Sequence, residues 1–348
     1  MRSTFFPKLV NGPYGDPALY LRIAHSKEAL LFDCGEIHRL SHREALKISS
    51  ILISHAHIDH LVGFDTLLRL FLNRPHPLKV FGPPGIIERI GSRLAGYTWN
   101  LTEGYPFCID VFEWGSERVL RATFRAENEF RCEEQKALPR DEFILKCPNY
   151  NVRAFPLDHG GLPSMAYALE ESSHVAIHKD GLLRENLLGG PWLTRFKALV
   201  REGLLEERIE IPLNGAGWNV VRVGELLKKI AHVERGMKIS YVTDVSPTAE
   251  NFEKIEGLAA NSHLLAIEAT FAHRDLDRAL KRGHLTARHA GEIARRAGAA
   301  RILVFHHSPR YREKTNGLAE EAHVAFTSSD RHASPSTPPG GEGQDRAP

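Results

Sequence analysis

Four potential metal ligands lie within six positions, shortly after an apolar run that ends at Ile53, namely His55, His57, Asp59 and His60. Side chains alternate where a chain leaves a strand, so His55 and His57 are expected to point to one side. The turn that follows brings the last two ligands to a neighbouring point. Imidazole and carboxylate groups suit zinc and, less selectively, manganese or iron. One metal ion would use two or three of these ligands, so their number indicates two ions. Their tight spacing favours a metal site over a solvated, inert histidine-rich loop.

Further candidate ligands stand at the ends of predicted strands. Strands expected at 150–157, 237–242 and 301–305 are followed, in this order, by His159, Asp244 and His306. With the first four they make seven groups, the number that two metals would use if one carboxylate bridges them. Asp33 lies in the strand end expected at 29–34, where it either orients a metal-bound histidine or caps the following helix.

The elements that must position these residues alternate between strand and helix. Helices are expected at 61–72, 85–95, 247–260 and 286–297. In the middle of the chain, consecutive strands at 107–114, 117–126 and 150–157 predict an antiparallel section, and a hairpin is expected from 165–170 and 175–179. The predicted fold class is α/β, an αββα sandwich of two mixed β-sheets with helices outside.

The composition is that of an ordinary soluble globular chain, with 42% hydrophobic and 25% charged residues. A formal net charge of +2 gives no global reason to expect nucleic acid, so any site for a polyanion must be a local patch. The 4 cysteines show no C-x-x-C spacing and indicate a reducing compartment. The first ten residues lack the long apolar core of a secretory signal, and the sequence contains no apolar run of about 18 residues that could span a bilayer. A cytoplasmic location without membrane contact is expected.

One catalytic domain is expected over residues 1–327. Residues 328–348 are rich in Pro, Gly, Ser and Asp and are expected to form a disordered tail. Within the domain, residues 181–213 are expected to form either an arm that meets the substrate or an ordinary connecting insert.

The chain resembles the metallo-β-lactamase superfamily and, within it, the ribonuclease Z family, over roughly residues 9–325. Besides the segment from His55 to His60, the resemblance rests on five motifs: Phe32-Asp33-Cys34-Gly35-Glu36, Thr243-Asp244, Glu268-Ala269-Thr270, His284-Leu285-Thr286 and His306-His307-Ser308-Pro309. Members of this family commonly form dimers, so the resemblance also implies a homodimer. It further implies a protruding arm between His159 and Asp244, the interval that contains 181–213.

The resemblance implies a division of the metal ligands between two zinc ions, with manganese or iron as alternatives. His55, His57 and His159 would hold one ion, Asp59, His60 and His306 the second, and Asp244 would bridge both. Two metals so placed can hold a hydroxide and contact a phosphoryl oxygen of a phosphodiester. Asp59 would orient or deprotonate the attacking water.

The same resemblance implies that Glu268 and His284 act at the leaving group of the reaction. A histidinium held by a carboxylate can donate a proton to the departing ribose oxygen. Alternatively, Glu268 is a structurally paired strand carboxylate and His284 merely begins a helix. Arg310 and Tyr311 could hold a phosphate, Arg310 through its planar guanidinium, unless they belong to a solvated surface turn.

The expected function is that of a dinuclear zinc phosphodiesterase. The resemblance implies an endoribonuclease that cleaves the 3′ extension of precursor tRNA by attack of a metal-bound hydroxide. Two alternatives stay open: a phosphodiesterase of the same fold that acts on small molecules or cyclic nucleotides, and a member that binds metal without catalysis.

Overall fold

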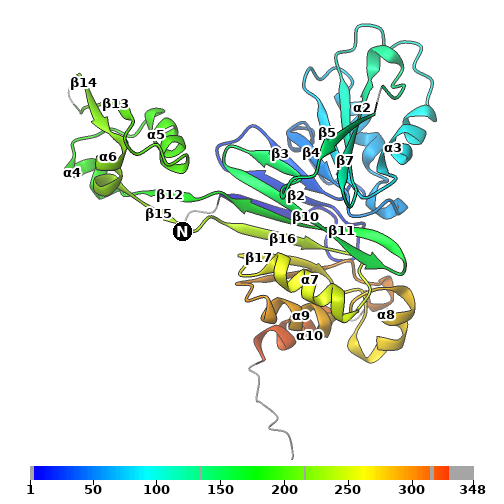
Figure 1. Ribbon diagram of the computed structural model, residues 1–348. Coiled ribbons are helices and arrows are strands. Elements are labelled where there is room, and N and C mark those ends of the chain that lie inside the picture. Colours follow the sequence, from blue (N-terminus) through cyan, green and yellow to red (C-terminus); the bar gives the residue numbers. More distant parts are fainter. Residues whose placement is uncertain (1–3, 134, 215–216, 314–316, 329–348) are drawn as a thin grey trace, which may run out of the picture.

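Two β-sheets pack face to face in the computed structural model of the chain (Figure 1). The structure describes residues 4–133, 135–214, 217–313 and 317–328. Apart from Ser328, the expected tail lies outside these residues. Aromatic rings fill the space between the sheets: Tyr241 stacks on Phe32 of the opposite sheet and on Phe305 of its own, with centroids 5.4 and 5.2 Å apart. These buried rings fix the distance between the two sheets.

The first sheet contains eight strands in chain order: β1 (Phe5–Leu9), β2 (Leu19–Ile23), β3 (Ala29–Phe32), β4 (Ile48–Leu52), β5 (Leu78–Gly82), β6 (Cys108–Trp114), β7 (Arg118–Arg125) and β8 (Lys136–Pro139). Strands β3 to β6 run parallel to one another, whereas the outer strands pair in antiparallel fashion. Parallel strands end at the same edge of a sheet, so the residues after β3 and β4 lie together.

The second sheet has the order β18 (Ile302–Phe305), β17 (Leu264–Glu268), β16 (Lys238–Val242), β11 (Leu162–Glu171), β10 (Tyr150–His159) and β9 (Leu145–Cys147). Strands β16, β17 and β18 are parallel. Strand β11 is antiparallel to both β10 and β16, so β10 runs in the same direction as β16. Four strands of this sheet therefore deliver their carboxyl ends to one edge.

Helices cover the outer face of each sheet. Helices α2 (Phe64–Phe71) and α3 (Ile86–Ala95) pack on the first, and α7 (Ala249–Ala259), α9 (Ala287–Arg296) and α10 (Gly317–Thr327) pack on the second (Figure 1). The short helices α1 (His42–Ala45) and α8 (Leu276–Arg282) complete the sandwich. The expected αββα architecture of two mixed sheets is thus confirmed. None of the helices in the described ranges combines the length and apolarity needed to cross a membrane.

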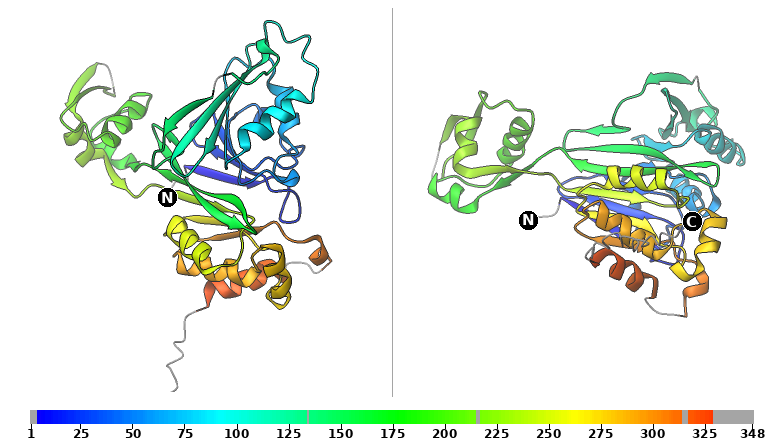
Figure 2. Two further views of the ribbon diagram at one scale, coloured as in Figure 1. Left: turned by 45° about the vertical axis from the view of Figure 1, so that its right-hand side comes forward. Right: turned by 60° about the horizontal axis from the view of Figure 1, so that its bottom comes forward.

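The described residues between 174 and 234 form a separate projection, which we call the arm. Figure 2 shows it standing away from the sandwich in both views. Its base, which we call the neck, is a two-stranded ribbon of β12 (His174–Ile177) and β15 (Ala231–Glu234). Beyond the neck lie α4 (Lys179–Arg184), α5 (Trp192–Arg201), β13 (Arg208–Pro212), β14 (Trp218–Arg222) and α6 (Val223–Ile230), which share an apolar core of their own.

The neck corrects one expectation about local structure. Residues 165–170 and 175–179 do not form a hairpin, because β11 pairs with β10 and β16 while β12 pairs with β15. The projecting unit also begins before residue 181 and ends after residue 213. Its strands pair across more than 50 positions of sequence, for example His174 with Glu234, and local alternation does not reveal such a partner.

Candidate metal centre

The carboxyl edges of the two sheets meet, and all seven expected metal ligands gather there. Three sets of side chains each place one ligand atom per residue within 4.8 Å of the others: His55, His57, His159 and Asp244; Asp59, His60 and His306; and Asp244, Glu268, His284 and His306. The first sheet supplies the ligands from 55 to 60, and the second supplies the rest. The centre is therefore built by the contact between the sheets.

Asp244 lies in the middle of this cluster. Its Oδ2 is 3.2 Å from His55 Nε2 and 3.1 Å from His60 Nε2, and its Oδ1 is 2.9 Å from His306 Nδ1. Although both are close to Oδ2, the buried Nε2 atoms of His55 and His60 make no hydrogen bond of acceptable geometry. Two buried ring nitrogens that converge on one carboxylate oxygen without hydrogen bonds fit ligands of cations that the carboxylate would bridge.

The protonation states in the centre suit a cation as well. Burial lowers the pKa of His55, His57 and His159, which keeps these imidazoles neutral. Burial would raise the pKa of the two aspartates, but facing histidines outweigh it: the pKa of Asp59 falls to about 2, and that of Asp244 lies well below its usual value. Neutral imidazoles and ionised carboxylates are the forms that bind metal.

Two histidines of the cluster behave differently. Burial would lower the pKa of His60, but Asp33 and Asp244 outweigh it and raise that pKa to about 10. Likewise, Asp244 raises the pKa of His306 well above its usual value despite burial. A cation bound beside these rings must displace their protons, so metal affinity is expected to fall at low pH.

Asp33 holds His60 in position from the side opposite the centre. Its fully buried carboxylate lies with Oδ2 2.8 Å from His60 Nδ1 and also accepts hydrogen bonds from Ser54 N, Ser54 Oγ and the Tyr241 hydroxyl. This arrangement leaves His60 Nε2 for the centre, the usual support of a metal-bound histidine. Sequence reasoning identified Asp33 but missed Ser54 and Tyr241. Ser54 directly precedes His55, which was a local signal, whereas nothing near Tyr241 in the sequence pointed to Asp33.

Backbone strain accompanies three of these side chains. Asp33, Asp244 and His306 have φ angles of 53°, 48° and 57°, in the left-handed region that residues with a Cβ rarely adopt. Each follows a strand of the sandwich core directly or after one residue. The unusual conformation turns the chain at the strand end and aims the side chain into the space between the sheets. Packing against the two sheets must stabilise it, because such a conformation costs of order 1 kcal/mol or more.

His159 is oriented by a backbone carbonyl. It ends β10, and the tight turn Gly160-Gly161, with φ angles of 62° and 90°, reverses the chain into β11. His159 Nδ1 donates to the carbonyl oxygen of Gly283 at 2.8 Å, which leaves Nε2 for the centre. Gly283 itself has a φ of 68° and ends α8.

Alanine at position 283 is expected to weaken metal binding about 10–100-fold, because it disturbs the carbonyl that orients His159. The added Cβ would lie 3.2 Å from His159 Nδ1 and 3.3 Å from Gly160 N. Gly298→Ala is the matched control: Gly298 has a similar φ of 63°, but a Cβ there would make only ordinary contact with Asn261. Both variants should lose about 1 kcal/mol of stability in chemical denaturation. If Gly283→Ala and Gly298→Ala hold metal equally well in competition with a chelator, this role of Gly283 is contradicted.

Glu268 and His284 lie together at the border of the centre. Glu268 is fully buried at the end of β17, and its Oε2 is 2.9 Å from His284 Nδ1. The same carboxylate accepts hydrogen bonds from Val245 N and Thr270 Oγ1. With both oxygens engaged, Glu268 is better placed to hold His284 than to bind a metal. His284 Nδ1 is 3.7 Å from Asp244 Oδ1, so the pair adjoins the cluster.

The hydroxyl of Tyr311 is already engaged in a hydrogen bond and is not free to bind a phosphate. Its ring is buried against the second sheet, and the hydroxyl donates to Asp275. The sequence offered no sign of this partner, which lies 36 positions away. Arg310 is exposed in the short helix Pro309–Tyr311. Its contact with a phosphate stays a prediction.

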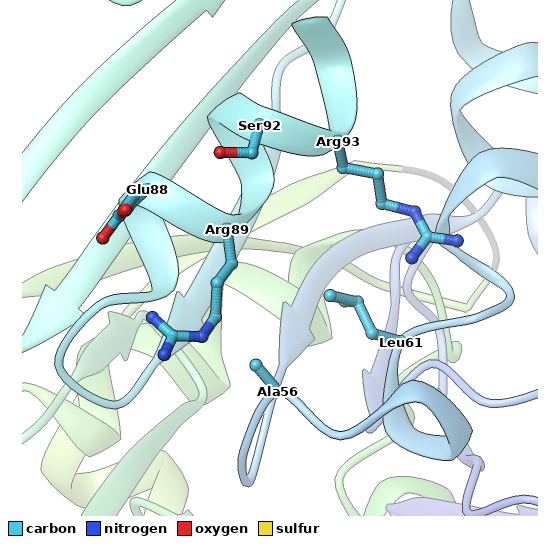
Figure 3. Close-up of a pocket in the computed structure, with 6 residues that line it drawn as sticks. All are labelled: Ala56, Leu61, Glu88, Arg89, Ser92 and Arg93. Atoms are coloured by element: carbon cyan, nitrogen blue, oxygen red, sulfur yellow. The ribbon is translucent and has the colours of Figure 1, made fainter. Parts of the chain in front are cut away.

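A cavity of about 430 Å³ borders the loop that carries the first ligands. It is lined by Ala56 and Leu61 of that loop and by Glu88, Arg89, Ser92 and Arg93 of α3 (Figure 3). Arg93 is paired with Asp65, while Arg89 is exposed and donates to the carbonyl of Gly85. The surface beside the loop is therefore polar and carries both acidic and basic side chains.

Comparison of the chain with known proteins matches it to a family. A model described as "Beta-lactamase superfamily domain" matches residues 30–179. A protein of Deinococcus radiodurans named Ribonuclease Z is 31% identical, over 86% of this chain and 89% of its own length. A Ribonuclease Z of Gemmatimonas aurantiaca is 30% identical, over 88% of this chain and 85% of its own.

Solved structures with the same fold include the short form of human tRNase Z and the metallo-β-lactamase fold protein YhfI of Bacillus subtilis. The human protein superposes with a TM-score of 0.52 at 19% identity, over 88% of this chain and 93% of its own. For YhfI the TM-score is 0.51 at 16% identity, over 91% of this chain and 92% of its own. At these identities the likeness concerns the fold.

Proposed function

Since the chain belongs to the ribonuclease Z family, a family of metal-dependent hydrolases, we propose that it removes the 3′ extension of precursor tRNA at a dinuclear zinc centre. The observation that carries the proposal is the Glu268–His284 pair beside the metal ligands. A hydrolase with a good leaving group needs no such pair, whereas a departing ribose oxygen needs a proton. Zinc as the metal, the homodimer and the cytoplasmic location belong to the same proposal.

The ligands divide naturally between two ions in this proposal. His55, His57 and His159 would hold one, Asp59, His60 and His306 the other, and Asp244 would bridge them. A pair of divalent cations supplies an activated water and a Lewis acid for the phosphoryl oxygen. Asp59 supports this assignment because its ionised carboxylate lies 3.3 Å from His306 Nε2 and 3.5 Å from His60 Nε2, where it can also accept the proton of a water.

His284 would protonate the departing 3′ oxygen of the tRNA. Burial disfavours the charged form of its ring, but Glu268 outweighs burial and raises the pKa of His284. Because Nδ1 donates to Glu268, Nε2–H carries the proton that remains available. The half-buried position of the ring restricts water, which strengthens the pairing with Glu268.

Glu268→Gln is expected to move the alkaline limb of the kcat profile to lower pH. A general acid works below its pKa, so activity is lost as the pH rises through that pKa. Removing the carboxylate that raises the pKa of His284 shifts this loss downward. Glu256→Gln is a suitable control, since Glu256 pairs with Arg296 on the surface of the second sheet's helices. An alkaline limb that stays in place in Glu268→Gln would exclude His284 as the acid.

The arm would contact the body of the precursor tRNA. From residue 174 to 234 it carries nine Lys and Arg against eight Asp and Glu, so charge alone does not give it affinity for RNA. It does expose apolar side chains, among them Trp218 at 69% exposure in the β13–β14 hairpin. An exposed indole can stack on a base or ribose, a contact worth about 1–3 kcal/mol.

The experiment that tests the proposed function compares two substrates on one preparation of enzyme. Precursor tRNA should be cut at the boundary of its 3′ extension, leaving a 3′ hydroxyl, and cleavage should weaken with rising salt as phosphate contacts are screened. Bis(p-nitrophenyl) phosphate reports the metal centre alone. Turnover of the small ester without cleavage of any precursor tRNA at low salt would overturn the tRNA assignment and favour a small-molecule phosphodiesterase.

A further inference from the structure

The neck of the arm carries a second group of histidines, far from the catalytic edge of the sheets. His174 pairs with Glu234 and Ala176 with His232 across the ribbon, and the backbone N–H of His178 continues the pairing by donating to Ile230. Side chains alternate along strands, so His174, His178, His232 and Glu234 share one face of the neck. His178 and His232 are exposed, and none of the four takes part in the centre described above.

Two imidazole nitrogens on this face point at each other. His178 Nε2 lies 2.5 Å from His232 Nδ1, and the rings are tilted by 37° with centroids 4.8 Å apart. On its other side, His232 Nε2 lies 2.5 Å from Glu234 Oε1. Glu234 is ionised, since the bond from His232 lowers the pKa of its carboxyl. His232 therefore donates from Nε2 and directs the lone pair of Nδ1 toward His178.

We propose that His178 and His232 form a third metal site, which binds zinc or a similar divalent transition metal across the two strands of the neck. The carboxylate behind His232 fixes its tautomer, as carboxylates do for metal-bound histidines elsewhere. Without metal, His178 would donate Nε2–H to His232 Nδ1, and with metal bound His178 would carry its proton on Nδ1 and offer Nε2. Zinc–nitrogen bonds of about 2.0–2.1 Å in tetrahedral geometry require the two nitrogens to be about 3.3 Å apart. The exposed rings need to separate by less than about 1 Å from their present contact to reach that distance.

This site would be weaker than the catalytic centre. It offers two protein ligands, with water completing the coordination, whereas in the proposed dinuclear centre each ion would have three ligands of its own and share Asp244. Soft or borderline cations such as zinc, nickel and copper prefer imidazole, so magnesium and calcium should not compete. The third metal should therefore be the first to leave when a chelator is added.

The location gives the site a structural consequence. Strands β12 and β15 carry the chain between the sandwich and the arm, and their register covers four residue pairs. Arg201 of α5 adds hydrogen bonds to the carbonyl of Ser173 and to Asn149 Oδ1 beside the neck. A metal bound to one histidine from each side of the ribbon would tie its two chains together near the arm. The neck would become stiffer, and the orientation of the arm relative to the catalytic edge would be restricted. This consequence does not depend on the identity of the substrate.

The test begins with full-length enzyme whose catalytic centre has been filled with zinc. Titration with further zinc in a calorimeter should show one additional equivalent in the wild type. His178→Ala and His232→Ala should each abolish it, and Glu234→Gln should weaken it about 10–100-fold. His38→Ala is the matched control, because His38 is also exposed and lies 3.0 Å from a glutamate, Glu36, with no second imidazole in contact among the described residues. It should keep the additional equivalent.

Hydrogen exchange provides the second measurement. The added zinc should slow amide exchange in residues 174–178 and 230–234 of the wild type and leave it unchanged in His178→Ala. Turnover of bis(p-nitrophenyl) phosphate should be the same in all variants and shows that each has folded. The proposal is overturned if the wild type binds no zinc beyond its catalytic centre, or if both alanine variants still bind the additional equivalent. A bound third metal without slower exchange in the neck would overturn the stiffening.

Discussion

Alanine in place of His284 is expected to lower kcat on precursor tRNA by about 10²–10⁴-fold, the usual contribution of a general acid, while the protein keeps both catalytic metals. The reason is that His284 is expected to supply a proton, whereas other side chains would hold the metals. Glu268 uses its buried carboxylate to hold the ring and raise its pKa, and nothing in the contacts of His284 requires it as a ligand. Single-turnover cleavage with saturating enzyme isolates the chemical step from product release.

Two controls separate this outcome from a general loss of structure. His289→Ala removes a half-buried histidine of the same region that packs on Phe252 and lies outside the centre, so it should keep its activity. Elemental analysis of His284→Ala should give the same metal content as the wild type. If metal is lost with the ring, His284 belongs to the alternative set with Asp244, Glu268 and His306 and is a ligand. A substrate with a p-nitrophenolate leaving group should be much less affected, because that group departs without a proton.

Much of the catalytic edge could be predicted because its residues end strands. The apolar runs before His55, Asp244 and His306 are short and bounded by turn residues, and each forms a parallel strand, largely buried in β4 and β16 and half-buried in β18 at the sheet edge. Parallel strands of one sheet deliver their ends to one edge, so a pattern repeated along the sequence becomes a cluster in space. The expectation of an αββα sandwich followed from the same alternation.

Contacts between distant segments could not be predicted in this way. The Tyr241 hydroxyl reaches Asp33 across 208 positions, and Tyr311 is held by Asp275. Both contacts depend on how the sheets and helices pack, which hydrophobic periodicity does not encode. The resemblance to the family supplied the motif that contains Asp33, but the tyrosine that fixes its carboxylate became visible only in the structure.

The limits of the arm illustrate the same difficulty. Residues 175–179 begin with a short apolar run, which predicts a hairpin with residues 165–170. In the structure its partner is β15, which follows a complete subdomain with its own core. The pairing closes a long loop, and its stability comes from the packing of the arm rather than from local sequence. The boundaries of such an insertion are set by contacts that lie outside any local window of sequence.

Removal of the arm should affect catalysis on precursor tRNA far more than on a small ester. Residues 174–234 can be replaced by a short linker, because Glu171 N donates to Met237 O where the flanking strands lie side by side. The sandwich cores contain no residue of the arm, so the catalytic edge should fold unchanged. We expect kcat/KM on precursor tRNA to fall about 100-fold, which corresponds to about 2.7 kcal/mol of lost binding.

The small ester gives the internal control for this deletion. Turnover of bis(p-nitrophenyl) phosphate and the metal content should stay within about twofold of the wild type, because neither requires contacts beyond the centre. Trp218→Ala in the intact arm should reproduce part of the loss, by the roughly 1–3 kcal/mol of a stacked ring. The deletion also removes His174 and Arg201, which lie 3.2 and 3.9 Å from Glu171 Oε1, but Thr4 Oγ1 and Met237 N still donate hydrogen bonds to this buried carboxylate. If the enzyme without the arm cleaves precursor tRNA as well as the wild type does, the arm is a connecting insert. Substrate recognition must then lie on the sandwich, and the cavity beside α3 would be the first surface to test.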